Sequence, residues 1–185
     1  MQGTGADRRR QIIARIVISL LIIVALVAID QVTKLIFNNL KASGEWQKTT
    51  VIDGFFYFEY AFNKGAAWSF LANKDWGQLF FKILTSVALI GFIVYLAFVI
   101  KGKYKVLLAG TILVISGTIG NFIDRLFLGG VTDFISFYFG SYHFPIFNIA
   151  DTFLTVGVII VIVHYLFLDD KAVFRKNANK EVSDK

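Results

Sequence analysis

The 185-residue sequence contains no cysteine, a single proline and two histidines. The absence of cysteine excludes disulfides, thiolate metal sites and a cysteine nucleophile. The only proline, Pro145, lies outside every long apolar run, so these runs can form unbroken helices. Because His143 and His164 are the only histidines and form no metal-binding motif, we expect neither a metal site nor a cofactor. We expect His164, in an apolar run, to be a packed or interfacial residue.

Apolar residues make up 56% of the chain, above the roughly 45–50% of soluble domains. The excess lies in four runs, each close to the roughly 20 residues that cross a bilayer as a helix. The first run continues in a helical pattern beyond Asp30, and we interpret it as a retained helix rather than a cleaved signal peptide. The sequence therefore predicts four membrane-spanning helices at residues 12–37, 80–100, 106–123 and 149–168.

The net charge of +6 is distributed unevenly along the chain. Twelve of the 19 basic residues lie before or at the start of the first run, between the second and third runs, or after the fourth. These regions fall on the same side of a four-helix protein, and the positive-inside rule makes that side cytoplasmic. We therefore expect both termini inside, with an outer loop at 38–79 and an outer segment at 124–148. This distribution explains the charge without a nucleic-acid partner.

The outer loop has a composition typical of strands. Residues 51–60 are rich in aromatic and β-branched side chains, and a turn signal follows at 63–68. We expect a small β-sheet element on the membrane surface here. Trp46, Trp68 and Trp76 lie in the same loop. These aromatic residues either anchor the loop at the interface or shape a groove for an extended peptide or acyl chain.

Four aspartates lie at the predicted outer helix ends or in the outer segment. Acidic residues beside apolar helices usually mark function or a paired structural role. Asp30 is one helical turn from Lys34, which suggests an ion pair with a structural or substrate-positioning role. Asp151 lies one turn after Asn148, and these two residues fit a capped helix start that can also present a catalytic acid. The remaining two aspartates are Asp124 and Asp133.

Two close carboxylates are suited to aspartic catalysis. One, ionised, accepts a proton from water, while the other, protonated, donates to a carbonyl; such a pair shares one proton near neutral pH. Arg125 can pair with Asp30 or Asp124, or hold a polar group of a ligand. A serine–histidine site is a second reading, with Ser116 or Ser136 beside His143, but neither serine lies in a recognised nucleophile turn.

Five segments resemble the lipoprotein signal peptidase family, in the family's order and in the expected topological places. They are 30–34 (DQVTK), 63–68 (NKGAAW), 120–125 (GNFIDR), 131–135 (VTDFI) and 144–151 (FPIFNIAD). Each segment alone is weak, whereas five in order are highly specific. Two small departures are Ser116-Gly117-Thr118, where the family often has Gly-Gly-Ala, and Thr132, where it often has valine.

The resemblance implies an intramembrane aspartic endopeptidase that removes the signal peptide of diacylglyceryl-modified prolipoproteins just before the lipidated cysteine. It also implies that Asp133 and Asp151 form the catalytic pair, a choice that the residues alone leave open between Asp133 and Asp124. The supporting residues that it implies are Asp30, Lys34, Asn63, Gly65, Asn121, Asp124, Arg125 and Asn148.

The sequence thus predicts an all-α integral membrane fold. The resemblance implies that residues 1–185 form one membrane-embedded peptidase domain. The resemblance places this domain in the bacterial cytoplasmic (inner) membrane with its site at the outer face, among membrane lipids. It also implies inhibition by globomycin-type cyclic peptides. The alternative is a small non-enzymatic transporter or membrane chaperone that uses the same carboxylates for protons or cations.

Overall fold

The computed structural model describes residues 5–44, 46–65 and 76–169. Trp68, Ala66, Ala67 and the basic residues after position 169 lie outside these ranges. The long helices are α1 (Gly5–Ala42), α2 (Gly77–Val99), α3 (Lys105–Phe127) and α4 (Ile149–Val163), the last continuing as a π-helical turn, η2 (His164–Leu168). The strands are β1 (Lys48–Ile52), β2 (Phe56–Asn63), β3 (Val131–Phe139) and β4 (Tyr142–His143).

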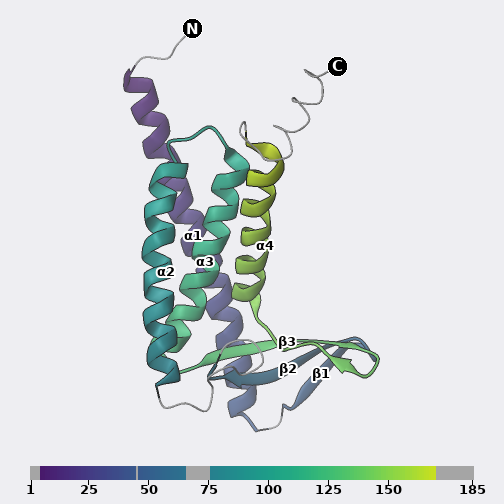
Figure 1. The fold of residues 1–185 in the computed structure, drawn as a ribbon. Helices are drawn as coiled ribbons and strands as arrows, with labels where there is room; N and C mark the ends of the chain where they lie inside the picture. The colour runs from purple at the N-terminus through teal and green to yellow at the C-terminus, as the bar shows by residue number, and fades with distance from the viewer. Residues whose placement is uncertain (1–4, 45, 66–75, 170–185) are drawn as a thin grey trace, which may run out of the picture.

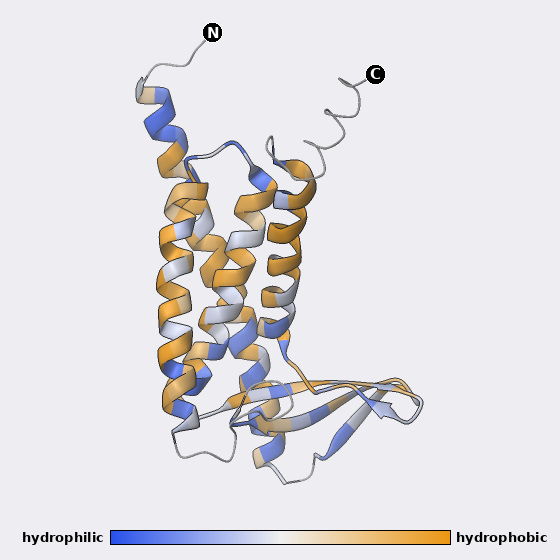
Figure 2. Cartoon of the chain, viewed as in Figure 1, coloured by the Kyte–Doolittle hydropathy of each residue, from blue (hydrophilic) through white to orange (hydrophobic). Residues whose placement is uncertain are grey.

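Within the described residues, four helical segments are long and apolar enough to cross a membrane: α1, α2, α3, and α4 with η2. They form a bundle, with the sheet at one end (Figure 1). Helix α3 is central, because 61% of its most apolar window is buried, against 11% or less for each of the others. The exposed apolar surfaces of the outer helices suit contact with lipid (Figure 2). These features confirm the prediction of a four-helix membrane protein with a small sheet.

Small residues bring α3 and α4 into close contact. A β-carbon on Gly157 would lie 2.7 Å from the carbonyl oxygen of Gly110, and one on Gly117 would collide with the backbone of Ala150. Membrane helices commonly pack through such small residues, because lipid offers no hydrophobic drive for their association. This packing fixes the start of α4 against the sheet end of α3.

Helix α1 extends beyond the predicted span of 12–37 at both ends. Its first turns carry exposed arginines, and its last turns carry exposed or half-buried polar residues such as Asn38 and Lys41. Apolar length indicates the span of a helix through lipid, whereas backbone hydrogen bonding continues into water where no residue breaks the helix. The start of α1, the α2–α3 turn and the end of η2 lie at the end of the bundle opposite the sheet (Figure 1).

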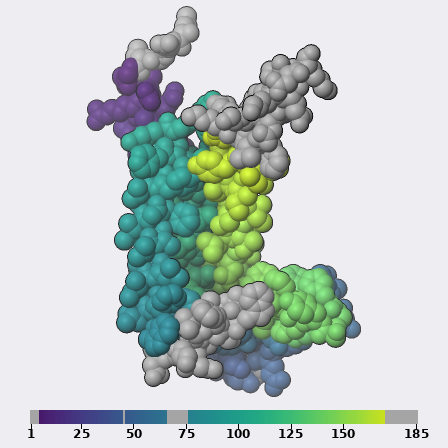
Figure 3. All heavy atoms as spheres, viewed as in Figure 1, coloured from purple at the N-terminus to yellow at the C-terminus, as the bar shows by residue number. Residues whose placement is uncertain are grey.

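The antiparallel sheet has the order β1-β2-β3-β4. Strands β1 and β2 come from the connection between α1 and α2, and β3 and β4 come from the connection between α3 and α4. The sequence predicted strands only within 38–79, yet β3 and β4 come from the segment expected to join the last two helices. Phe56 pairs with Phe137, and Ala61 pairs with Asp133, across a register shift. The sheet protrudes sideways from the bundle (Figure 3).

Aromatic side chains join α1 to this sheet. The ring of Phe37 stacks on Phe134 with 4.2 Å between centroids, and Trp46 packs against Phe37. The indole N–H of Trp46 donates to Thr49 Oγ1 at 2.7 Å. Trp46 therefore packs against α1 and β1.

Candidate active site

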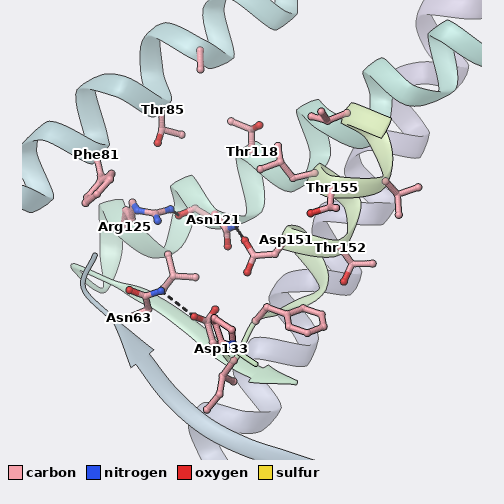
Figure 4. A pocket seen from close by; sticks show the side chains of 18 of the residues that line it. Asn63, Phe81, Thr85, Thr118, Asn121, Arg125, Asp133, Asp151, Thr152 and Thr155 are labelled. Atoms are coloured by element: carbon pink, nitrogen blue, oxygen red, sulfur yellow. Dashed lines mark hydrogen bonds between the residues drawn. The ribbon is translucent and has the colours of Figure 1, made fainter. Parts of the chain in front are cut away.

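One cavity of about 840 Å³ lies between α2, α3, α4 and the sheet end of the bundle. Asp133, the third residue of β3, and Asp151, in the first turn of α4, both line it (Figure 4). Asn63, Asn121 and Arg125 also face this cavity. The structure thus brings together five of the predicted site residues, from two strands and two helices. We refer to Asp133 and Asp151 as the aspartate pair.

Asp151 is held by a capping box at the start of α4. Its backbone N–H donates to Asn148 Oδ1 at 2.9 Å, and its Oδ2 accepts the backbone N–H of Asn148 at 3.2 Å. Its other oxygen, Oδ1, accepts from Asn121 Nδ2 at 2.7 Å. The capping interpretation is confirmed, and the capped residue also faces the cavity.

Asp133 receives amide donors at both carboxylate oxygens. Asn63 Nδ2 lies 3.2 Å from Oδ2, and Asn148 Nδ2 lies 2.7 Å from Oδ1. Asn148 therefore contacts both members of the aspartate pair, although it is fully buried and does not line the cavity. This bridging amide fixes the strand-borne carboxylate relative to the helix-borne one.

The pKa of Asp133 is raised from 3.8 to about 7, first by burial and then by the negative charge of Asp151. The hydrogen bonds from Asn63 and Asn148, and the charge of Lys34, oppose this increase. Asp133 is only 3% exposed, so water does little to stabilise its charge. The aspartate pair can therefore carry a single proton near neutral pH, as general acid–base chemistry requires.

A buried ionic network lies behind the cavity. Lys34 Nζ lies 2.9 Å from Asp30 Oδ2, 3.1 Å from Asp124 Oδ2 and 3.0 Å from Asn121 Oδ1. The predicted Asp30–Lys34 ion pair is confirmed, and Asp124 is a second partner of the lysine. All three charged side chains are at most 2% exposed. Through Asn121, this network connects directly to Asp151.

Both buried acids also fix backbone segments. Asp30 Oδ1 accepts the N–H of Ala150 at 2.9 Å, in the first turn of α4. Asp124 Oδ2 accepts the N–H of Thr132 at 3.1 Å, the residue before Asp133. The two carboxylates that do not line the cavity therefore position the chain segments that carry the aspartate pair.

Sequence reasoning missed two residues of this network. Gln31 Nε2 lies 3.1 Å from Asp30 Oδ2, from Asp124 Oδ1 and from the carbonyl oxygen of Gly120. Thr132 is fully buried, and its hydroxyl donates to Asn38 at 3.0 Å. Their positions inside two of the family-like segments were the available signal. Gly120 has a separate role, because any β-carbon there would collide with the Asp30 carboxylate.

Arg125 lies on the cavity side of α3. Its Nη2 lies 3.4 Å from the carbonyl oxygen of Gly65, and its guanidinium lies over the ring of Phe81. Lys34, rather than Arg125, makes the close ion pairs with Asp30 and Asp124. The buried Nε of Arg125 has no hydrogen-bond partner among the described residues. Of the roles predicted for Arg125, holding a polar group of a ligand fits this position best.

The Asn63–Gly65 turn is ordered by its own side chain. Asn63 Oδ1 accepts the N–H of Gly65 at 2.9 Å, while its amide nitrogen donates to Asp133. Gly65 does not line the cavity itself. The turn therefore links Arg125 and Asp133 at the edge of the cavity.

The serine–histidine alternative has the wrong geometry for a nucleophile. Ser136 Oγ lies 2.9 Å from His143 Nε2, but it also lies 3.1 Å from Glu59 Oε2, to which it donates. The serine is then the central residue, whereas a triad needs the histidine between the serine and the acid. Ser136 is fully buried and lies outside the cavity lining.

Two other sequence expectations concern histidine and metal sites. His164 is 1% exposed and packs edge-on against the ring of Tyr104, which confirms a packed histidine. Among residues 5–44, 46–65 and 76–169, no group of three potential metal ligands occurs.

The rest of the cavity wall is mainly apolar, with threonines at intervals. Phe81, Leu84 and Phe92 come from α2, and Phe144 and Phe147 precede α4. Neither Trp46 nor Trp76 lines it. Among the described residues, the aromatic wall therefore comes from α2 and from the segment before α4 rather than from Trp46 or Trp76.

Four apolar helices with two carboxylates in one cavity define a multi-pass membrane protein whose site suits acid–base chemistry. Residues 22–167 match the family model described as signal peptidase (SPase) II. The chain therefore belongs to the signal peptidase II family, and it is a protease.

Relatives and solved structures agree with this assignment. A lipoprotein signal peptidase of Bacillus pumilus is 44% identical over 147 residues, covering 79% of this chain and 90% of the relative. One of Listeria monocytogenes serotype 4a is 43% identical over 155 residues, covering 82% and 94%. Two solved structures titled as a bacterial membrane enzyme superpose with TM-scores of 0.67 and 0.66, at 35% and 36% identity. They cover 84% and 82% of this chain, and 93% and 94% of their own.

Proposed function

We propose that this protein is an aspartic endopeptidase that removes the signal peptide from diacylglyceryl-modified prolipoproteins, just before the lipidated cysteine. Family membership supports cleavage of lipoprotein signal peptides. The observation that carries the proposed mechanism is the presence of Asp133 and Asp151 in one cavity, bridged by Asn148.

The reaction begins with the pair carrying one proton. The ionised aspartate takes a proton from water as the water oxygen bonds to the scissile carbonyl carbon, and the protonated aspartate gives its proton to the carbonyl oxygen. Collapse of the resulting diol breaks the carbon–nitrogen bond. The proton first taken from water passes to the leaving amine, which is the nitrogen of the lipidated cysteine. One diol hydroxyl returns its proton to the aspartate that had protonated the carbonyl oxygen, so the new acid forms and the pair again carries one proton. Neither a metal nor a cofactor takes part.

The amide side chains hold this pair in position during the reaction. Asn63 and Asn148 donate to Asp133, and Asn121 donates to Asp151, so each carboxylate is fixed before the substrate enters. Fixed geometry removes much of the entropic cost of bringing water, carbonyl and catalytic groups together. The Lys34 network keeps Asn121 in place from behind.

The substrate peptide lies extended beside the Asn63–Gly65 turn, with Arg125 holding one of its carbonyl oxygens. This placement is supported by the position of Arg125 in the cavity wall and by its contact with Gly65. The acyl chains lie along the apolar helices, where Phe81, Leu84 and Phe92 offer a continuous surface. Globomycin-type cyclic peptides inhibit by occupying the same cavity.

The site faces the outer side of the bacterial cytoplasmic membrane, and both termini are cytoplasmic. The support is that the start of α1, which carries Arg8, Arg9 and Arg10, and the α2–α3 turn, which carries Lys101 and Lys103, lie at the end opposite the sheet (Figure 1). The sheet and the aspartate pair then lie at the outer interface, within reach of a substrate anchored in the outer leaflet. Residues 1–185 act as one peptidase domain.

The transporter or chaperone alternative has less support. Transport favours carboxylates at mid-depth and broken helices. Here the acids gather at the sheet end, and no proline interrupts the four long helices. The test is incubation of purified protein with a diacylglyceryl-modified prolipoprotein peptide. A single cut before the modified cysteine supports the proposal, and an intact peptide under conditions where the protein is folded contradicts it.

A further inference from the structure

A second, smaller hollow lies at the end of the bundle opposite the sheet. Its volume is about 180 Å³, and it lies between the first turns of α1 and the turn that joins α2 to α3. Arg8 and Arg15 line it from α1, and Lys101 and Lys103 line it from the turn. No acidic residue is among its lining residues. Three cations, Arg8, Arg15 and Lys101, therefore converge on the hollow, while Lys103 Nζ lies over the ring of Tyr104.

Arg15 connects the two sides of this hollow by hydrogen bonds. Its Nη1 donates to the carbonyl oxygen of Ile100 at 3.2 Å and to that of Gly102, which ties α1 to the α2–α3 turn. Among the described residues, none of Arg8, Arg15 and Lys101 has a carboxylate partner within salt-bridge distance. The guanidinium of Arg15 carries five N–H donors, and among the described residues carbonyl acceptors engage only its Nη1.

The apolar surroundings of the hollow indicate what kind of anion fits. Ile12 lines the hollow beside these cations, and Ile16, one turn further along α1, is exposed on the bundle surface. A ligand that places a phosphate among the cations can therefore lay an acyl chain over this apolar face. Basic pockets between membrane helices commonly bind anionic headgroups in this way.

We propose that this hollow, where Arg8, Arg15 and Lys101 converge, binds the phosphate headgroup of an anionic phospholipid. The site is separate from the cavity that holds the aspartate pair, and it does not depend on the proposed catalytic mechanism. The occupant is a lipid rather than a free phosphate, because the cationic pocket continues directly into exposed apolar surface. Occupation links α1 to the α2–α3 turn through a shared anion.

The test measures binding of phosphatidylglycerol and of phosphatidylcholine to the purified full-length protein in detergent, by native mass spectrometry. The test variant combines Arg8→Gln with Lys101→Gln. The matched control combines Arg9→Gln with Arg10→Gln, which removes the same charge from the same end of the molecule but from residues outside the hollow. Thermal unfolding of both variants establishes that each is folded.

We expect the wild-type protein to prefer phosphatidylglycerol, and the test variant to lose affinity for it by about 10-fold or more. The control variant should remain within about 2-fold of the wild type, and inorganic phosphate at millimolar concentration should not displace the lipid. Equal losses of affinity for phosphatidylglycerol in the two variants would show that general surface charge causes the binding, and would overturn the proposal. Absence of a preference over phosphatidylcholine, or displacement by inorganic phosphate, would also overturn it.

Discussion

The Nδ2 atom of Asn148 lies 2.7 Å from Oδ1 of Asp133, so the residue that caps α4 also holds the carboxylate carried by β3. The same side chain accepts the backbone N–H of Asp151 through its Oδ1. One buried amide thus combines a helix-capping role with alignment of the aspartate pair. These two roles can be separated by substitution.

Asn148→Ser keeps a capping oxygen but cannot reach Asp133, whereas Asn148→Ala loses both interactions. We expect both variants to lose cleavage activity by roughly 10-fold to 100-fold, because Asp133 is no longer fixed. The serine variant should be more stable than the alanine variant by about 1 kcal/mol, the usual value of an N-cap. Thermal unfolding and single-turnover cleavage test this. If the serine variant instead recovered activity together with stability, Asn148 would act only as a helix cap.

Asp124→Asn should act on stability more than on chemistry. Asp124 is buried against Lys34, and loss of one partner of a buried pair costs about 3–5 kcal/mol. We expect a clearly lower melting temperature with some residual cleavage by the fraction that folds. Asp53→Asn, in the exposed β1–β2 turn, is the matched control. A stable Asp124→Asn protein without any activity would mean that Asp124, not Asp133, is the partner of Asp151.

The sequence predicted the features that depend on neighbours within a helical turn. Apolar runs located the helices, and one-turn spacing correctly paired Asp30 with Lys34 and Asn148 with Asp151. The contacts of Asp133 could not be derived in this way, because they depend on pairing between β2 and β3 across some 70 residues of chain. Without that register, the residues left Asp124 and Asp133 equivalent, and only the family resemblance separated them.

Gln31 shows a second limit of sequence reasoning. It bonds two buried acids and a backbone carbonyl. Apart from its place in the family-like segment 30–34, a glutamine next to an aspartate on a helix carries no signal of this role. Its role depends on how closely α1 approaches Gly120 of α3, a tertiary contact. Local patterns therefore identify the charged residues but not the neutral side chains that satisfy them.

The pH dependence of activity and stability should reflect the proton on Asp133. Because its pKa is raised from 3.8 to about 7 in the folded protein, kcat/KM should fall as the pH rises above about 7. The folded state also binds this proton more tightly than the unfolded chain does. The stability contributed by Asp133 is therefore fully present below pH 3.8 and declines as the pH rises to about 7.

Thermal unfolding of the wild type and of Asp133→Asn between pH 4 and pH 8 measures this contribution. The difference in stability between the two should shift in favour of the asparagine variant as the pH rises through this range. Asp53→Asn should show no such shift relative to the wild type. An unchanged difference at pH 4 and pH 8 would mean that Asp133 ionises normally.

The substrate lipid should increase cleavage strongly. Acyl chains lying along the bundle gain about 0.8 kcal/mol per buried CH₂ and hold the scissile bond at membrane depth. We expect a diacylglyceryl-modified peptide to be cut far faster than the same peptide with an unmodified cysteine. A control peptide with its lipid attached elsewhere separates this effect from simple recruitment to the membrane. Equal cleavage of the membrane-bound control would indicate a more general intramembrane aspartic protease.

The central claim is that Asp133 and Asp151 perform the chemistry, and the most direct test is cleavage by Asp133→Asn and Asp151→Asn. An amide is nearly isosteric with the carboxyl group but cannot transfer the proton. We therefore predict that each folded variant loses at least about 10²–10⁴-fold in cleavage rate, while Asp53→Asn retains wild-type activity. If either variant, shown by thermal unfolding to be folded, cleaved the lipidated peptide at a rate near that of the wild type, the account would be contradicted.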